Sequence, residues 1–190
     1  MRLDLVVGPN GAGKSTFVRL ILAPNVPGSA FVNADVIAAD RWPEDPEGHS
    51  YDAAKVAGET RTKLIQLRRP FIAETVCSHP SKLELVHAAR VAGYYVALHV
   101  VMIPEDLSVA RVAARVVAGG HSVPEDKIRQ RHRRLWPIVA EAAAVADTAT
   151  FWDNSRDDGP TQAALLADGT VVGNTSWPDW VSTELTHRWP

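Results

Sequence analysis

The sequence predicts an α/β fold of three layers, in which helices cover both faces of a mainly parallel sheet. Short apolar stretches of strand length alternate with segments of helical apolar spacing along the 190 residues. A glycine-rich loop separates the first strand from the first helix, and an acidic residue follows each of the next two strands. This order is typical of parallel sheets that bind ligands at the carboxyl ends of their strands.

The expected elements follow one another from the first residues onward. Residues 3–7 are mostly apolar, as in a buried parallel strand, and helical spacing covers 16–22 until Pro24. Residues 39–49 are predicted to form a loop, and residues 162–167 and 170–173 a terminal hairpin that turns at Asp168-Gly169. Further strands are expected at 30–33, 71–73, 94–103 and 148–153, and further helices at 51–69, 82–92, 107–117 and 125–146. We therefore expect a five-stranded, mainly parallel sheet followed by the hairpin.

Residues 8–15 read G-P-N-G-A-G-K-S and match the phosphate-binding pattern G-x-x-x-x-G-K-[ST]. The glycines let the backbone curl around phosphate oxygens, and the loop opens a helix whose dipole favours an anion. Lys14 is predicted to neutralise β- and γ-phosphate charge, and the Ser15 hydroxyl to ligate Mg²⁺. The motif therefore predicts a P-loop NTPase or kinase fold that binds ATP (or GTP) through Gly8, Pro9, Asn10, Gly11, Ala12, Gly13, Lys14, Ser15 and Thr16.

Two carboxylates stand at expected strand ends. Asp35 follows the second strand and Glu74 the third. A kinase needs one carboxylate to orient or deprotonate the attacking hydroxyl, and often another to hold Mg²⁺ directly or through water. The alternative is that both are capping or solvated acids. Asn154 follows the 148–153 strand, and we expect it to contact adenine, with a turn residue as the alternative.

A basic cluster flanks Gly119-Gly120. A helix–Gly-Gly–helix element rich in arginine predicts a lid, at about residues 111–134, that closes over the phosphates. A solvated basic helix face, or a strip that binds RNA, is the alternative. We expect one or two of these cations to act in the site: Arg111, Arg115, Lys127, Arg129, Arg131, Arg133 and Arg134.

Composition limits the classes of function. The net charge of −2, and the lack of aromatic residues among the lid arginines, argue against a nucleic-acid binder. The single cysteine, Cys77, excludes an intramolecular disulfide framework and favours a reducing compartment. No signal peptide is recognisable, and no apolar run approaches the length of a membrane span. We expect one cytoplasmic kinase domain over residues 1–190, without a membrane or zinc site, and with His99 as a hydrogen-bonded core histidine.

Several of these motifs together resemble the zeta-toxin family of P-loop kinases. The resemblance spans roughly residues 1–170 and resides in 8–16, 33–35, 73–75, Arg115, 119–125 and 152–155. It implies a kinase that phosphorylates the 3′-hydroxyl of the amino sugar in UDP-N-acetylglucosamine, and an antitoxin protein as a partner. Asp35 would be the base on that hydroxyl, Arg115 would brace the transferring phosphate, and Lys14 and Ser15 would hold nucleotide and Mg²⁺.

The resemblance also implies the substrate side of the site. Glu74, with the neighbouring Thr75, would bind the sugar nucleotide. His121 stands where classical zeta toxins carry a second lid arginine, which is typical of a shorter Gly-Gly-His branch. Two other readings stay open: a P-loop kinase of another small molecule or of an RNA end, and a nucleotide-dependent switch.

Overall fold

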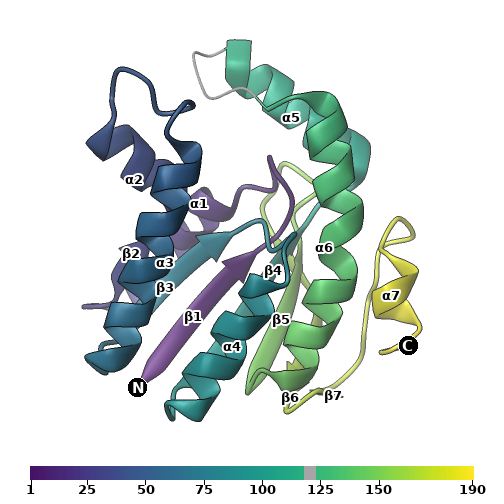
Figure 1. Ribbon diagram of the computed structural model, residues 1–190. Coiled ribbons are helices and arrows are strands. Elements are labelled where there is room, and N and C mark those ends of the chain that lie inside the picture. Colours follow the sequence, from purple (N-terminus) through teal and green to yellow (C-terminus); the bar gives the residue numbers. More distant parts are fainter. Residues whose placement is uncertain (118–122) are drawn as a thin grey trace.

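The described residues form a sheet between two layers of helices, which is the three-layer α/β fold that the sequence predicts, and the sheet has seven strands (Figure 1). The computed structural model describes residues 1–117 and 123–190. The strand order is β2-β3-β1-β4-β5-β6-β7. The first five run parallel, β6 pairs antiparallel with β5, and β7 pairs antiparallel with β6. Their bounds are β1 Arg2–Val7, β2 Ala30–Val32, β3 Phe71–Thr75, β4 Tyr95–Met102, β5 Thr148–Asp153, β6 Thr161–Ala167 and β7 Thr170–Val171.

The helices divide between the two faces of the sheet. Those on one face are α3 (Ser50–Gln66), α4 (Ser81–Val91), α6 (Glu125–Val145) and α7 (Thr183–Thr186), which contribute to one hydrophobic core with Leu3, Leu5 and Val7 of β1. The other face carries α1 (Lys14–Phe17) with its continuation and the start of α5 (Glu105–Val117), packed on Val6. Successive β1 residues thus enter different cores, as the period of a strand requires.

Three expectations about the elements were wrong in detail. The terminal hairpin does not stand apart, because β6 pairs antiparallel with β5 and raises the sheet from five strands to seven. The predicted loop at 39–49 begins late, because α2 (Ala34–Arg41) occupies its first residues and is capped by the Asn33 side chain. Pro24 does not end the first helix at once: a π-helical turn (Val18–Leu22) continues into a 3₁₀ turn (Ala23–Asn25) that accepts proline in its first turn.

The first strand itself contains a buried acidic residue, Asp4. Asp4 is 1% exposed and accepts hydrogen bonds from Arg2, at 2.7–3.0 Å, and lies 3.1 Å from His99 Nε2. Burial alone would raise the pKa of Asp4, but the hydrogen bonds from His99 and Arg2 outweigh it and hold that pKa below its usual range. His99 is only half satisfied, since its Nδ1 has no partner within residues 1–117 and 123–190.

No helix among these residues has the length and apolar character needed to cross a membrane.

Candidate active site

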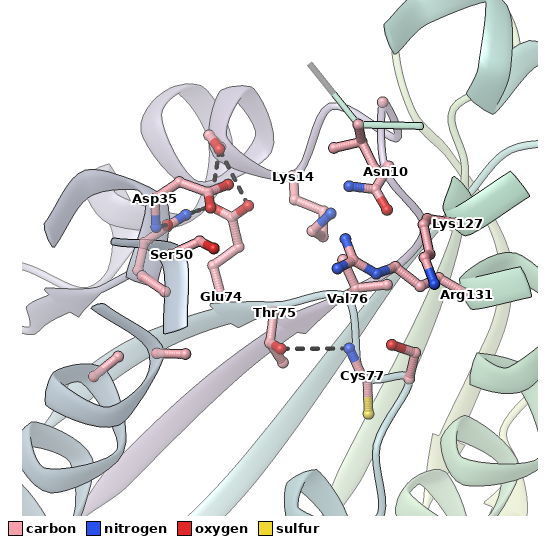
Figure 2. Close-up of a pocket in the computed structure, with 18 of the residues that line it drawn as sticks. Asn10, Lys14, Asp35, Ser50, Glu74, Thr75, Val76, Cys77, Lys127 and Arg131 are labelled. Atoms are coloured by element: carbon pink, nitrogen blue, oxygen red, sulfur yellow. Dashed lines mark hydrogen bonds between the residues drawn. The ribbon is translucent and has the colours of Figure 1, made fainter. Parts of the chain in front are cut away.

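A cavity of about 950 Å³ lies where the central parallel strands end (Figure 2). Its walls come from the glycine-rich loop, the starts of α2 and α3, the segment from β3 to α4, and the facing sides of α5 and α6. Asp35 and Glu74 lie together on one side, Lys127 and Arg131 lie on the other, and Lys14 stands between them (Figure 2). Predicted residues that are far apart in sequence therefore meet in one pocket.

The loop owes its shape to close backbone contacts. A Cβ on Gly8 would lie 2.1 Å from the carbonyl oxygen of Val101 on β4, which no side chain can accept. Gly13 has a φ of +83°, and a Cβ there would meet the Asn154 amide at 2.7 Å. Gly8, Pro9 and Ala12 are buried behind the loop, whereas the residues of the loop that line the cavity are Asn10, Gly11, Gly13, Lys14, Ser15 and Thr16.

Lys14 is a buried cation, and within residues 1–117 and 123–190 its ammonium group makes one hydrogen bond, to the Pro9 carbonyl at 2.9 Å. Burial lowers the pKa of Lys14, and Arg115 lowers it further, while the carboxylates of Glu74 and Asp35 raise it. The predicted site residues Glu74, Asp35 and Arg115 thus all act electrostatically on Lys14. A phosphate placed on the loop would supply the anion that Lys14 lacks.

Ser15 and Glu74 form the second part of the site. The Ser15 hydroxyl lies 2.9 and 3.1 Å from the two carboxylate oxygens of Glu74, and Asn33 Nδ2 donates to Glu74 at 2.8 Å. The sheet sets this position, because Glu74 pairs in register with Val6 just before the loop. These hard oxygen donors fit Mg²⁺, which is usually held by one or two carboxylates, phosphates and water. Among the described residues no group of three or more His, Cys, Asp or Glu side chains gathers as a metal site.

Asp35 lies in the first turn of α2, where its backbone N–H donates to Asn33 Oδ1 at 2.6 Å. The cap holds the start of the helix at the pocket wall, so the exposed Asp35 carboxylate faces the cavity. One amide, Asn33, therefore positions both carboxylates: its oxygen fixes the backbone of Asp35 and its nitrogen fixes Glu74. Thr75 also lines the cavity, and its hydroxyl accepts a hydrogen bond from the Cys77 N–H at 3.4 Å.

The lid cations separate into two groups. Arg111, Arg115, Lys127 and Arg131 line the cavity. Arg129 and Arg133 instead pair with Glu105 at 3.0 and 3.1 Å, and Arg129 also pairs with Asp106 and Glu125. Of the expected lid cations, Arg129 is thus held by carboxylates away from the cavity, whereas Arg131 lines it. His121, with Gly119, Gly120 and Ser122, lies outside the described residues.

Asn154 supports the loop from behind. The side-chain amide of Asn154 donates a hydrogen bond to the Ala12 carbonyl at 2.8 Å. The backbone carbonyl of Asn154 accepts a hydrogen bond from the Arg111 guanidinium at 2.9 Å. Ser108 on α5 donates to the Asn10 carbonyl. These bonds join β5, the loop and α5. The contact of Asn154 with adenine stays a prediction.

Several cavity residues carry no signal in the sequence. Arg61 and Tyr51 come from α3, and Lys82 from the start of α4. Each lies in an ordinary amphipathic helix, and no spacing links one to another. The arrangement of the helices over the sheet brings them together.

The family model described as "AAA domain" matches residues 3–138, which is most of the chain. This chain belongs to the AAA domain family. A relative from Haemophilus influenzae, itself described as an uncharacterized protein, is 31% identical over 126 residues, which are 66% of this chain and 88% of the relative.

Solved structures share the fold of this AAA domain. The AvrRxo1-ORF1:AvrRxo1-ORF2 complex with sulphate ions matches with a TM-score of 0.70 at 14% identity, and the same complex with ATP with 0.66. The alignment covers 90% of this chain but only 60% of that chain. The PezAT chromosomal toxin-antitoxin system of Streptococcus pneumoniae matches with 0.63 at 16% identity, covering 84% of this chain and 69% of the other. Shikimate kinase from Acinetobacter baumannii, with shikimate, matches with 0.51 at 18% identity, covering 75% and 80%. The AAA domain of this chain thus has a P-loop kinase-like fold.

Proposed function

We propose that this chain is a kinase that transfers the γ-phosphoryl group of ATP to a hydroxyl of a small molecule. The observation that carries the proposal is the convergence of Lys14, Asp35 and Arg115 in one cavity on a phosphate-binding loop. A switch needs no exposed carboxylate facing the phosphates, whereas a kinase needs one to receive the acceptor's proton. We take residues 1–190 as one kinase domain that works in the cytoplasm.

The proposed step uses the two sides of the cavity. Asp35 accepts the proton of the acceptor hydroxyl as its oxygen bonds to the γ-phosphorus, and the bond from that phosphorus to the β–γ bridging oxygen breaks. ADP carries away the electron pair of that bond. Lys14, Arg115 and Arg131 stabilise the charge on the transferring group, because they are cations already held around it.

Ser15 and Glu74 would hold Mg²⁺ in this site. When bound, the ion would neutralise charge on the β- and γ-phosphate oxygens. Asn33 would keep the Glu74 carboxylate turned toward Ser15, as its 2.8 Å hydrogen bond does in the structure. This assigns Glu74 to the metal, and leaves Thr75 on the acceptor side.

The leading acceptor is UDP-N-acetylglucosamine at its 3′-hydroxyl. The support comes from the motifs shared with zeta toxins and from the fold shared with the PezAT system. A cavity of about 950 Å³ is of the size that small-molecule ligands occupy.

The test is mass spectrometry of UDP-sugars incubated with Mg·ATP and the protein. We expect UDP-N-acetylglucosamine to gain the mass of one phosphoryl group, and Asp35→Asn to lose about 10²–10⁴-fold in rate while still binding nucleotide. Asp40→Asn is the matched control, because Asp40 is exposed on the same helix and outside the cavity. ATP turnover without a modified sugar would reject this acceptor. Full activity of Asp35→Asn would reject Asp35 as the base.

An antitoxin partner follows from the same proposal, supported by the toxin-antitoxin system among the matching structures. Induced expression of the chain should then arrest bacterial growth, and Asp35→Asn should not. Arrest by both variants would show that any toxicity is independent of phosphoryl transfer.

A further inference from the structure

Two cations lie in the part of the cavity wall that is formed by α3 and by the start of α4. Arg61 is 8% exposed, and Lys82 is partly buried. Across residues 1–117 and 123–190 neither side chain has a hydrogen bond or an ion pair. The kinase proposed above uses neither side chain to bind nucleotide, to accept the proton of the acceptor or to hold Mg²⁺.

Several other cations of this protein are paired with carboxylates. Arg2 pairs with Asp4, Arg90 with Asp147 and Arg129 with Glu105. Buried charges in proteins are normally paired, because an isolated ion loses its hydration without compensation. Within the described ranges 1–117 and 123–190, Arg61 and Lys82 lack the carboxylate partners that Arg2, Arg90 and Arg129 have.

Among the described residues, no carboxylate acts on the pKa of Arg61 or of Lys82. Burial lowers the pKa of Lys82, and the nearby Arg61 lowers it further. The one acid that raises the pKa of Lys82 is the thiol of Cys77, which itself is buried. Burial raises the pKa of Cys77 to about 12, so this thiol is neutral at physiological pH and gives no counter-ion. Lys82 and Arg61 therefore repel one another without a local anion.

We propose that Arg61 and Lys82 bind an oxyanion, a phosphate or a carboxylate, carried by the acceptor substrate. Both side chains line the same cavity as Asp35, so an acceptor held there by its anion would present a hydroxyl within that cavity. The acceptor is therefore an anionic small molecule, and a neutral sugar or alcohol is a poor substrate. That the bound molecule is a phosphoryl acceptor rests on the proposed kinase function. The anion site itself does not depend on that function.

The experiment measures anion binding with the loop already occupied. The protein is saturated with Mg²⁺ and a non-hydrolysable ATP analogue, and is then titrated by calorimetry with inorganic phosphate and, separately, with succinate. We expect saturable binding of at least one of them. Lys82→Met and Arg61→Met should each weaken it about tenfold or more, because each removes a charge-assisted contact. Lys63→Met, an exposed lysine of α3 outside the cavity, should bind as the wild type does.

The outcomes separate this inference from the proposed function. Absence of saturable binding, or wild-type binding by both variants, overturns the anion site. If Arg61→Met does not fold, Lys82→Met decides, since its side chain is only partly buried. Anion binding without any phosphoryl transfer keeps the site and rejects the kinase. Transfer that is equally efficient to neutral and phosphorylated forms of one sugar keeps the kinase and rejects this site. If the analogue itself does not bind, the same titration of the free protein still compares the variants.

Discussion

Replacing Lys14 by methionine should separate nucleotide binding from folding. Methionine keeps most of the buried stem and removes the ammonium group, which donates a hydrogen bond to the Pro9 carbonyl. The Pro9 carbonyl that accepts this bond also accepts from the Ala12 N–H at 3.3 Å, so the substitution leaves no unpaired group. We therefore expect the unliganded variant to unfold at the wild-type temperature or above it.

The nucleotide-bound protein should respond in the opposite direction. A charge-assisted contact to phosphate contributes about 1.5–3 kcal/mol, so Lys14→Met should weaken Mg·ATP binding roughly 10–150-fold. At a ligand concentration about 100 times the wild-type Kd, bound nucleotide stabilises the wild type by about 2.7 kcal/mol, which is roughly 5–10 °C in Tm. A variant that binds about 100-fold more weakly should gain only about 0.4 kcal/mol, or roughly 1 °C.

Thermal unfolding with and without Mg·ATP measures both effects. The control is Lys55→Met, an exposed lysine of α3, which should keep the full nucleotide-induced shift. A second readout comes from pH. Because the folded-state pKa of Lys14 is lowered, the unfolded chain binds more protons in the alkaline range, and wild-type stability should rise with pH there. Lys14→Met should lack this rise. A nucleotide-induced shift of wild-type size in Lys14→Met would refute the role given to Lys14.

Three further predictions concern the support of the site. Gly8→Ala should lower Tm by several degrees and abolish nucleotide binding, because its Cβ would stand 2.1 Å from the Val101 carbonyl; thermal unfolding and nucleotide titration check this. Asp4→Asn should destabilise the protein at neutral pH, and the difference in urea-unfolding free energy should shrink as pH falls below about 4, since the lowered pKa of Asp4 gives stability only above that range. Asn154→Ala should weaken the binding of ATP and of inorganic triphosphate equally, because the 2.8 Å hydrogen bond of Asn154 to Ala12 holds the loop. Weaker binding of ATP alone would indicate that Asn154 contacts adenine.

The sequence was most informative where chemistry depends on neighbours along the chain. Residues 8–15 predict the loop because its spacing is local, and Asp35 and Glu74 could be placed together because parallel strands end at one edge. The role of Asn33 as the link between them could not be predicted, since it depends on the register of three strands and on the start of α2.

The charges of the lid and of α3 show where prediction failed. Lys127, Arg129, Arg131 and Arg133 alternate along one segment, and the sequence does not tell which face the cavity. Glu105, which lies on another helix 24 residues before Arg129 and 28 before Arg133, pairs with both of them and so keeps them away from the cavity. Arg61 lies within the predicted helix at 51–69, and only the packing of α3 over the sheet shows that this arginine is buried beside the pocket.

The two edges of the sheet are its shortest strands. β2 has three residues and β7 has two, whereas the strands between them have five to eight. An edge exposes backbone N–H and C=O groups that can pair with another chain, and short edge strands are one way in which proteins limit such pairing. Each end of this sheet offers only a few such groups. Copies of this protein should therefore resist joining edge to edge at high concentration, a favourable property for crystallisation with nucleotide and for handling of destabilised active-site variants.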